Sequence, residues 1–278
     1  GVASLVAVDT LAGLGAEVTP LFCDSDGTFP NHHPDPTVPE NLRDLQAAVA
    51  RTGAELGIAF DGDGDRIGAV DEHGRIIWGD QLLIVLGRDA VRRFGKGVPV
   101  IFDVKCSELL PRALEEAGAQ PVMWKTGHSL IKARMKELRA PLAGEMSGHM
   151  FFGGDWFGFD DALFAAARLL EIVAGAPGGL ARHLADLPET VTTPEIRVDC
   201  PEEIKFDVVS RAAAYFAERY RVNTIDGVRI AFDQGWGLLR ASNTQPVLVL
   251  RFEATSEALL TRYRDEVTGW LASQGIRA

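Results

Sequence analysis

Apolar residues recur along the chain with two periods that alternate. Spacings of three to four residues indicate helices, and short apolar runs bounded by Gly, Pro or Asp indicate strands. The spacing predicts helices over 2–14, 40–52, 80–94, 107–117, 129–138, 160–174, 201–219 and 256–273. It predicts strands over 16–22, 55–60, 66–74, 98–104, 120–125 and 140–146, with further short strands on either side of the helix at 201–219.

Strands that alternate with helices predict parallel sheets covered by helices, so we expect three-layer α/β domains. The pattern changes after the punctuation "LPETVTTPE", and the rest of the chain predicts a separate α+β domain. With 278 residues the chain has room for two or three domains. We expect domains over 1–75, 76–187 and 188–278. Because the helical pattern begins directly at Gly1, without an initiator methionine, we also expect an N-terminal portion to precede it.

Composition narrows the class of protein. The chain is 46% hydrophobic and 24% charged, as in an ordinary soluble protein. Its net charge of -11 argues against broad binding to nucleic acid or to an anionic membrane. No apolar run reaches the roughly 18 residues of a membrane span, and no signal peptide is visible. Three scattered cysteines favour a reducing compartment, so we expect a cytoplasmic protein with neither nucleic-acid nor membrane partners.

The stretch "AFDGDGDRIGAVD" gathers Asp61, Asp63 and Asp65 within five positions, followed at once by Arg66. Two carboxylates about 4 Å apart repel by roughly 4 kcal/mol at an effective dielectric near 20. The intervening glycines permit positive φ and leave room for a ligand, and alternate carboxylates can converge on one hard cation such as Mg²⁺. The alternative is an acidic turn whose three carboxylates point into water.

Polar residues stand at the ends of several predicted strands. Ligands of parallel sheets gather at the carboxyl ends of the strands. Asp61, Lys105, Lys125 and Glu145 each follow a predicted strand. We therefore expect all four to face one crevice, with Lys125 among the substrate-binding residues.

The stretch "AGEMSGHMFF" places Glu145, Ser147 and His149 on a loop bounded by glycines. Hydrogen-bond acceptors and donors presented together suit the hydroxyl groups of a sugar. The serine context is G-x-x-S-G and lacks the nucleophile-elbow pattern, which disfavours a hydrolase triad. A polar turn between core elements is the alternative.

The stretch "RASNTQPVLVLRFEA" predicts a turn between two strands that carries Arg240, Ser242, Asn243 and Thr244. A guanidinium, hydroxyls and backbone N–H groups that point at one space bind phosphate well. A hairpin loop made of ordinary turn-forming residues explains the same letters.

Other residues carry weaker signals. Lys105 could neutralise a phosphate or transfer a proton, and His128 precedes a helix whose dipole disfavours the imidazolium. Taken alone, each is more often structural. Cys106 lacks a partner histidine and is interpreted as a bystander thiol. Asp160 and Asp161 most simply cap the helix that follows them.

Five motifs in one order resemble a known family: "AFDGDGDRIGAVD", "IFDVK", "PVMWKTGHS", "GEMSGHMFF" and "RASNTQPVLVLRFEA". Together they resemble the α-D-phosphohexomutases, in particular the bacterial phosphomannomutase/phosphoglucomutase branch. The resemblance implies that the chain holds the later part of domain 2, the sugar-binding domain 3 and the phosphate-binding domain 4.

The resemblance also implies roles for the residues singled out above. It places Arg66 near the transferring phosphate, and Lys105 and His128 near the reacting oxygens. It assigns Mg²⁺ to Asp61, Asp63 and Asp65. It assigns sugar recognition to Glu145, Ser147 and His149. It assigns the non-transferred phosphate to Arg240, Ser242, Asn243 and Thr244.

The implied reaction is an isomerisation by intramolecular phosphotransfer. An enzyme phosphoserine passes its phosphoryl group to a hexose phosphate, and the hexose 1,6-bisphosphate intermediate reorients and returns the other phosphate. The family's serine loop, of the form T-A-S-H-N-P, does not occur in these 278 residues. We therefore expect the chain to work with an N-terminal domain of the same polypeptide, and to bind phosphosugars weakly without turnover when alone.

Two other readings stay open. "GIAFDGDGD" also looks like the opening of haloacid-dehalogenase-type phosphatases, with Asp61 as nucleophile and Asp63 as acid. Asp65 stands there at the position of an expected small hydroxyl residue, which favours metal ligation. The other reading is a non-catalytic module that binds sugar phosphates. The sequence does not decide between mannose and glucose phosphate.

Overall fold

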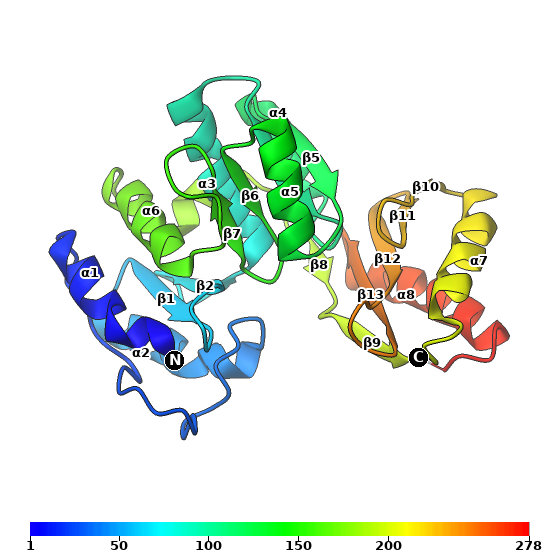
Figure 1. Cartoon of the computed structure of the whole chain (residues 1–278), viewed down its shortest axis with the longest axis horizontal. Coiled ribbons are helices and arrows are strands. Elements are labelled where there is room, and N and C mark those ends of the chain that lie inside the picture. Colours follow the sequence, from blue (N-terminus) through cyan, green and yellow to red (C-terminus); the bar gives the residue numbers. More distant parts are fainter. Residues whose placement is uncertain (278) are drawn as a thin grey trace. The chain divides into compact units, whose positions relative to one another are not determined.

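The structure is a computed structural model that describes residues 1–277 (Figure 1). Its α-helices are α1 Ala7–Gly13, α2 Arg43–Thr52, α3 Gly79–Phe94, α4 Leu109–Ala117, α5 His128–Leu138, α6 Ala162–Ala174, α7 Lys205–Ala217 and α8 Glu257–Ser273. Its strands are β1 Leu56–Phe60, β2 Ile67–Asp71, β3 Ile76–Ile77, β4 Pro99–Asp103, β5 Gln120–Trp124, β6 Leu142–Gly144, β7 Met150–Phe152, β8 Val191–Thr192, β9 Ile196–Asp199, β10 Arg221–Asn223, β11 Val228–Phe232, β12 Gly235–Ala241 and β13 Val247–Ala254. Short 3-10 helices are η1 Val2–Leu5, η2 Pro39–Leu42 and η3 Ala181–Leu184.

One predicted element is wrong. Residues 16–22 form no strand, although Val18 packs against the core. Pro20 cannot donate a ladder hydrogen bond, and Phe22 has a φ of 54° that no strand tolerates. A strand also needs a neighbour to pair with, and within residues 1–277 this segment has none.

The first sheet has the order β1-β2-β3, and all of its pairs are antiparallel. The side chains of β1 alternate between two helical layers. Leu56, Ile58 and Phe60 pack against the core cluster that contains α6, and a Cβ on Gly57 would meet α2. The loop "DGDGDR" joins β1 to β2, so its aspartates lie at the end of a strand held on both faces.

The second sheet has the order β5-β4-β6-β7. β4 and β6 are parallel, as the alternation of strands and helices predicts, and β7 returns antiparallel to β6 through the loop that carries "GEMSGH". Figure 1 shows α5 in front of these strands and α3 behind them. Buried Leu82, Leu83 and Leu86 of α3 join the same core cluster as Val100 and Phe102 of β4.

Residues from Pro188 onward form a second compact unit with residues 124–126, while residues 1–123 and 127–187 form the first. The sheet of the second unit has the order β10-β11-β12-β13-β8, with β9 also paired to β13, and the pairs are antiparallel. Helices α7 and α8 bury Phe216 and Val267 in its own core. The predicted class of α/β domains followed by an α+β domain is confirmed, whereas the predicted division into three domains stays a prediction.

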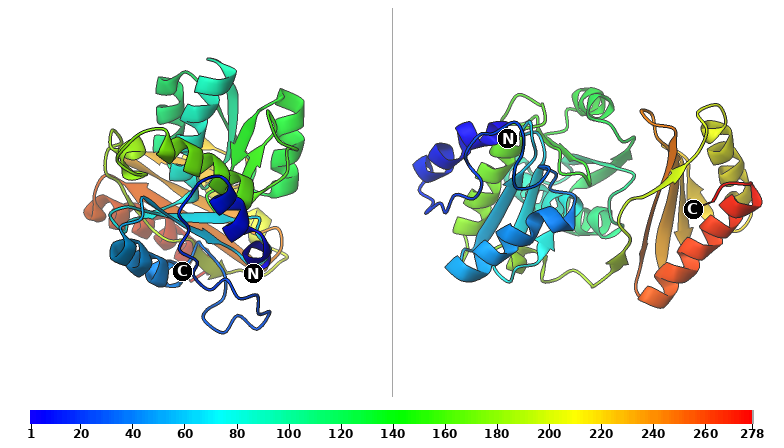
Figure 2. Two further views of the ribbon diagram at one scale, coloured as in Figure 1. Left: turned by 90° about the vertical axis from the view of Figure 1, so that its left-hand side faces the viewer. Right: turned by 90° about the horizontal axis from the view of Figure 1, so that it is seen from below.

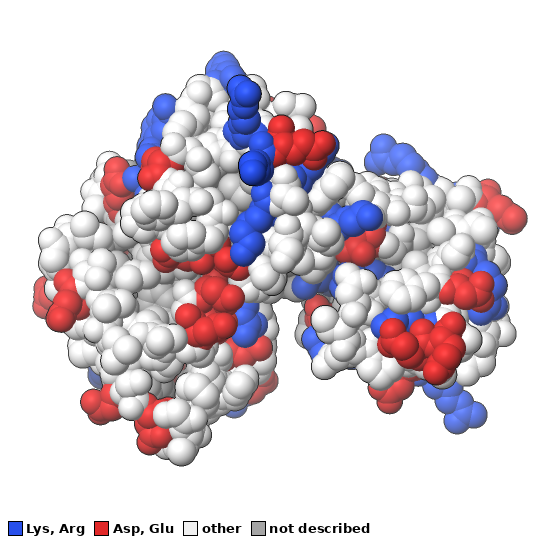
Figure 3. All heavy atoms as spheres, in the orientation of Figure 1, with Lys and Arg blue, Asp and Glu red and all other residues white. Residues whose placement is uncertain are grey.

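Within residues 1–277, no α-helix has both the length and the apolar character needed to cross a membrane. On the face drawn in Figure 3, acidic and basic side chains are interspersed among uncharged ones. An anion site on this face would therefore be formed by a local arrangement of side chains and not by a broad basic surface.

Candidate functional site

The loop between β1 and β2 folds around the carboxylate of Asp61. This side chain is 1% exposed, and its Oδ1 accepts hydrogen bonds from the backbone N–H groups of Gly64 (2.9 Å), Asp65 (3.1 Å) and Arg66 (3.2 Å). Gly64 has a φ of 79°, in the left-handed region that favours glycine. The D-G-D-G-D spacing is therefore what lets the loop turn back onto its first aspartate.

Arg66 neutralises this carboxylate and ties it to a distant loop. Its Nε donates to Asp61 Oδ2 at 2.6 Å, and its Nη1 donates to Asp35 Oδ1 at 3.2 Å. Burial works against an ionised Asp61, but the hydrogen bonds from Arg66 outweigh it and lower the pKa of this carboxyl. Sequence reasoning missed Asp35. Its signal is the Asx turn of "PDPT", in which Asp35 Oδ1 also accepts from the Thr37 amide at 2.9 Å.

The three aspartates of the loop converge. Asp61, Asp63 and Asp65 each present a carboxylate oxygen within 4.8 Å of the others. Burial, the hydrogen bond to Asp61 and the charge of Asp63 raise the pKa of Asp65 to about 6, although His149 acts in the opposite direction. Such repulsion among hard oxygen donors is what a Mg²⁺ ion relieves, so the donor set fits this metal.

The "GEMSGH" loop is a tight turn between β6 and β7 that contacts the aspartate loop. Glu145 N donates to His149 O (2.9 Å), and Ile67 N of β2 donates to Gly148 O (3.1 Å). Gly148 has a φ of 98°, and a Cβ there would lie 2.3 Å from Ile67 O. Only glycine allows this approach, and two motifs far apart in sequence meet through it.

Glu145 and His149 form a buried ion pair across the turn. His149 Nδ1 lies 2.7 Å from Glu145 Oε2 and 2.9 Å from Ser147 Oγ, and Glu145 Oε1 accepts from the Gly127 amide at 2.7 Å. Burial opposes both charges. The contact between them nevertheless lowers the pKa of Glu145 and raises that of His149, so it favours the charged form of each.

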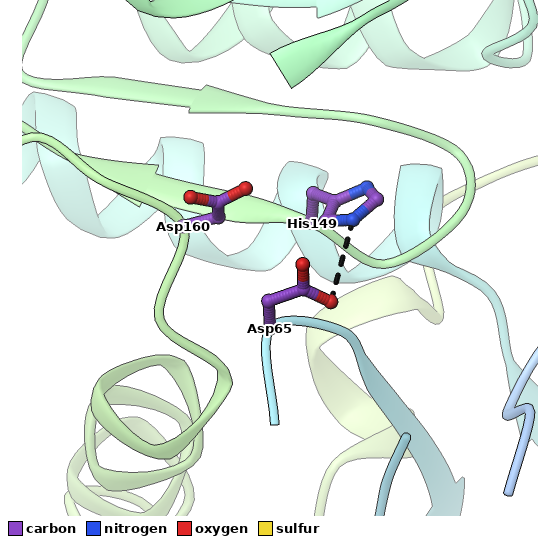
Figure 4. A group of neighbouring side chains, drawn as sticks. All are labelled: Asp65, His149 and Asp160. Atoms are coloured by element: carbon purple, nitrogen blue, oxygen red, sulfur yellow. Dashed lines mark ion pairs between the residues drawn. The ribbon is translucent and has the colours of Figure 1, made fainter. Parts of the chain in front are cut away.

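His149 also links the turn to the aspartates (Figure 4). Its Nε2 lies 3.5 Å from Asp65 Oδ1, and Asp160 lies beside both residues. Asp160 in turn accepts from Lys132 Nζ at 3.2 Å and lies 4.0 Å from His128 Nδ1. The predicted residue His128 is thus joined to the cluster through Asp160.

The capping interpretation of the aspartate pair is half right. Asp161 is the N-cap of α6, with its Oδ1 accepting from Phe164 N at 2.9 Å. Capping as the role of Asp160 is wrong, because its carboxylate faces the cluster and the first turns of α5. Adjacent residues in extended backbone point opposite ways, so one helix start accommodates only one of them.

Lys105 is linked to the same region by Asp103, which is fully buried. Its Nζ is 3.9 Å from Asp103 Oδ2, and Asp103 Oδ1 accepts from Met146 N at 3.1 Å. Burial raises the pKa of Asp103, with the charge of Glu145 adding to it and that of Lys105 opposing it. Sequence reasoning missed Asp103, whose signal was a carboxylate at the end of an otherwise apolar strand. Cys106 is buried and donates to Asp103, as a bystander thiol would.

The predicted phosphate turn belongs to the second unit. Arg240 is 7% exposed, its Nε donates to Asp226 Oδ2 at 3.2 Å, and its Nη2 forms an ion pair with the same oxygen at 3.1 Å. Ser242 Oγ accepts from Thr244 N (3.3 Å), while Asn243 and Thr244 are exposed. Asp226 was not predicted. Lys125 follows β5 and is exposed.

The chain is similar over nearly its whole length to proteins of one family. Models described as phosphoglucomutase/phosphomannomutase match residues 1–74 (alpha/beta/alpha domain II), 78–191 (alpha/beta/alpha domain III) and 195–269 (C-terminal domain). A phosphomannomutase/phosphoglucomutase of Pseudomonas putida is 51% identical over 267 residues, which are 95% of this chain and 57% of that protein. A phosphoglucomutase of Neisseria meningitidis is 49% identical over 269 residues, 96% of this chain and 58% of that protein.

Among solved structures, a phosphoglucomutase/phosphomannomutase family protein of Burkholderia thailandensis superposes with a TM-score of 0.90 at 49% identity. The match covers 98% of this chain and 58% of that one. The chain therefore spans a little under three fifths of the length of the relatives that it matches.

Proposed function

The chain belongs to the phosphoglucomutase/phosphomannomutase family. We propose on this basis that it forms part of a phosphohexomutase. The enzyme interconverts hexose 1-phosphate and hexose 6-phosphate, of mannose, glucose or both. The observation that carries the proposal is the contact between the "DGDGDR" and "GEMSGH" loops. Ile67 N donates to Gly148 O there, and His149 Nε2 lies 3.5 Å from Asp65 Oδ1. A cation site and a sugar-binding turn at one place are what phosphoryl transfer to a sugar requires.

The metal site of this proposal is the aspartate loop. Mg²⁺ would be held by Asp61, Asp63 and Asp65, and when bound it supplies positive charge that stabilises a transferring phosphoryl group. Arg66, fixed between Asp61 and Asp35, adds a guanidinium at the same place. Its orientation is set before substrate arrives, which makes it a preorganised phosphate-binding group.

The sugar-binding group of this proposal is the turn of Glu145, Ser147 and His149. The Glu145 carboxylate is anchored by Gly127 N and His149, so its position is fixed for accepting sugar hydroxyl protons in hydrogen bonds. Lys105 and His128 are proposed as the groups that hold protons or positive charge at the reacting oxygens, Lys105 through its Nζ beside Asp103.

Phosphate binding is proposed for the turn of the second unit. Asp226 accepts a hydrogen bond from Arg240 Nε and forms an ion pair with its Nη2, which orients the guanidinium. Ser242, Asn243 and Thr244 add hydroxyl, amide and backbone donors. Lys125 is proposed as a further substrate contact because its side chain is exposed just past β5.

The phosphoryl donor of this proposal is a phosphoserine outside these residues, and hexose 1,6-bisphosphate is the intermediate and activator. The chain alone is then expected to bind phosphosugars without turnover. Glucose 6-phosphate binding is to be measured calorimetrically in Mg²⁺, alongside a mutase assay with glucose 1,6-bisphosphate present. We expect Glu145→Gln and Arg240→Ala each to weaken binding about tenfold or more.

The control for that experiment is Arg221→Ala, which removes an exposed arginine from the same unit as Arg240. It should leave binding within about twofold. Binding that both site variants leave unchanged would overturn the proposed site. Robust turnover by the isolated chain would overturn the assignment of the donor to a serine elsewhere.

The phosphatase alternative gains no support from the loop. Asp61 would have to attack phosphorus, but its Oδ1 accepts three backbone hydrogen bonds and its Oδ2 accepts from Arg66. These hydrogen bonds orient the Asp61 carboxylate as they would a metal ligand, and Asp65 stands where that class of phosphatase has a small hydroxyl residue. A trapped aspartyl phosphate that Asp61→Asn abolishes would revive it.

A further inference from the structure

A fully buried lysine lies beside the phosphate turn, residues 242–246, which connects β12 to β13. Lys205 is 0% exposed and is the first residue of α7, which packs with α8 on one face of the sheet of the second unit (Figure 2). Burying an ammonium group costs free energy unless partners match its charge and its donors. The partners of Lys205 therefore indicate what its buried charge serves.

Lys205 has one partner in the phosphate turn and one at the surface. Its Nζ donates to the backbone oxygen of Gln245 at 3.1 Å and to Glu202 Oε2 at 2.6 Å, and it lies 5.1 Å from the ring centroid of Phe206. The side chain of Glu202 is 59% exposed, so water screens its ion pair with Lys205. The contact that holds the ammonium in the interior is the one with Gln245.

Other donors also hold the second half of the phosphate turn. Arg197 Nη1 donates to Gln245 Oε1 at 2.6 Å, and Val247 N donates to Gln245 O at 2.8 Å. The next carbonyl oxygen, of Pro246, accepts from Cys200 N at 3.0 Å. Carbonyl oxygens repel an anion, so a turn that binds phosphate needs its acceptors occupied by other donors. In this turn the segment around the start of α7 supplies those donors.

We propose that Lys205 is a positioning residue of the phosphate turn. It fixes the carbonyl group of Gln245 and supplies a buried positive charge that favours a phosphate monoester dianion at residues 242–244. A hydrogen bond from a charged donor is stronger than a neutral one, and a buried charge is screened less by salt than an exposed one. The inference rests on the proposed function of this turn and adds to it a residue from another element.

The test measures binding of glucose 6-phosphate to the whole chain by calorimetry in Mg²⁺, together with urea unfolding of each variant. Lys205→Met keeps a long unbranched side chain and removes the charge, so we expect the affinity to fall about tenfold or more. The urea midpoint should stay the same or rise. Val247 N still satisfies Gln245 O in this variant, and Glu202 stays solvated.

The matched control is Lys136→Met, which makes the same change at an exposed position of α5. It should change the affinity by less than about twofold. A residue needed only for folding would give a different result at position 205. Lys205→Met would then lower the urea midpoint and leave the affinity of the folded chain unchanged, which would overturn the proposal.

A second variant tests the charge without altering the buried position, and it decides the question if Lys205→Met does not fold. The exposed carboxylate of Glu202 offsets the charge of Lys205, so Glu202→Gln should strengthen binding about two- to threefold. Glu203→Gln removes the same charge at the adjacent exposed position and should leave the affinity unchanged. Binding that Glu202→Gln leaves unchanged or weakens would contradict the role of Lys205.

The variant Arg240→Ala separates this inference from the proposed function. If Arg240→Ala weakens binding while Lys205→Met and Glu202→Gln leave it unchanged, the turn binds phosphate and Lys205 has no part in it. If Arg240→Ala also leaves binding unchanged, the proposed function of the turn is wrong, and the role of Lys205 is wrong with it.

Discussion

His149 is the residue through which the sugar-binding turn and the aspartate loop are electrostatically coupled. Burial disfavours its charged form, but Glu145, Asp65 and Asp160 together raise its pKa above the ordinary value of 6.5. A raised pKa in the folded state means that the contribution to stability is complete below about pH 6.5 and is lost as pH rises through the folded value.

This coupling predicts a pH-dependent effect of His149→Gln. In buffer with a chelator, the loss of unfolding free energy caused by the substitution should be largest near pH 6 and should shrink toward pH 9. Urea denaturation at several pH values measures it. His73→Gln, at an exposed ring, should change stability little at any pH. A loss for His149→Gln that stays constant or grows with pH would contradict the coupling.

Gly148 is the residue whose backbone conformation allows the two loops to meet. Gly148→Ala adds a Cβ 2.3 Å from Ile67 O at a φ of 98°, so we expect a loss of at least about 2 kcal/mol in unfolding free energy. Gly13→Ala is the matched control. Its Cβ would meet nothing within 4 Å at the end of α1, and the change should be neutral or stabilising by up to about 1 kcal/mol. Equal effects of the two substitutions would refute the steric argument.

At the residue scale, the sequence indicated side chains whose chemistry is visible in a short motif. It did not indicate Asp35 or Asp103, because their importance comes from partners that only the fold supplies. Asp35 needs Arg66 from 31 positions further along, and Asp103 needs Met146 from 43 positions further along. A single carboxylate in a Pro-rich loop or at a strand end has many ordinary explanations, so neither could be selected without the structure.

At the element scale, most helices and strands were predictable because their apolar periods are strong and their ends carry Gly, Pro or Asp. Residues 16–22 are the exception. A strand is stable only with a partner, and periodicity along one segment carries no information on whether a partner is present. The parallel pair of β4 and β6 followed from the alternation of helices and strands, whereas the antiparallel return of β7 depends on the tight turn at Gly148.

The start of α6 offers a test at this scale. Asp161 Oδ1 caps the helix at Phe164 N, and its Oδ2 accepts from Trp156 Nε1 at 3.0 Å. Asp161→Ala removes both hydrogen bonds, so we expect a loss of about 1 to 2 kcal/mol from the first unit. Urea unfolding followed by far-UV circular dichroism measures this loss. A change below about 0.3 kcal/mol would show that the cap is not needed.

At the scale of the whole molecule, the chain has two cores, one in the unit of residues 1–123 and 127–187 and one in the unit that begins at Pro188 and includes residues 124–126. The fold class, α/β followed by α+β, could be predicted because the pattern of helices and strands in the sequence changes near residue 187. We expect the two units to respond separately to substitution. Ser256→Ala, which removes the cap of α8 at Leu259 N, should lower protection from hydrogen exchange in α8 and leave α6 unaffected.

Asp161→Ala should have the converse effect, lowering protection in α6 but not in α8. The two variants thus serve as controls for each other, since each removes one N-cap from one unit. If both variants lower protection equally in both helices, the chain unfolds as one cooperative unit and the separation into two cores is wrong.

The central claim is that the three carboxylates of the aspartate loop form a divalent-cation site. Its most direct test is calorimetric titration of the chain with MgCl₂, using Asp63→Asn, at an exposed ligand position, and Asp207→Asn, at an exposed position on α7, as a matched pair. We expect one Mg²⁺ per chain, with affinity lowered about tenfold or more by Asp63→Asn and unchanged by Asp207→Asn. No saturable binding at millimolar Mg²⁺, or binding that Asp63→Asn leaves intact, would contradict the account.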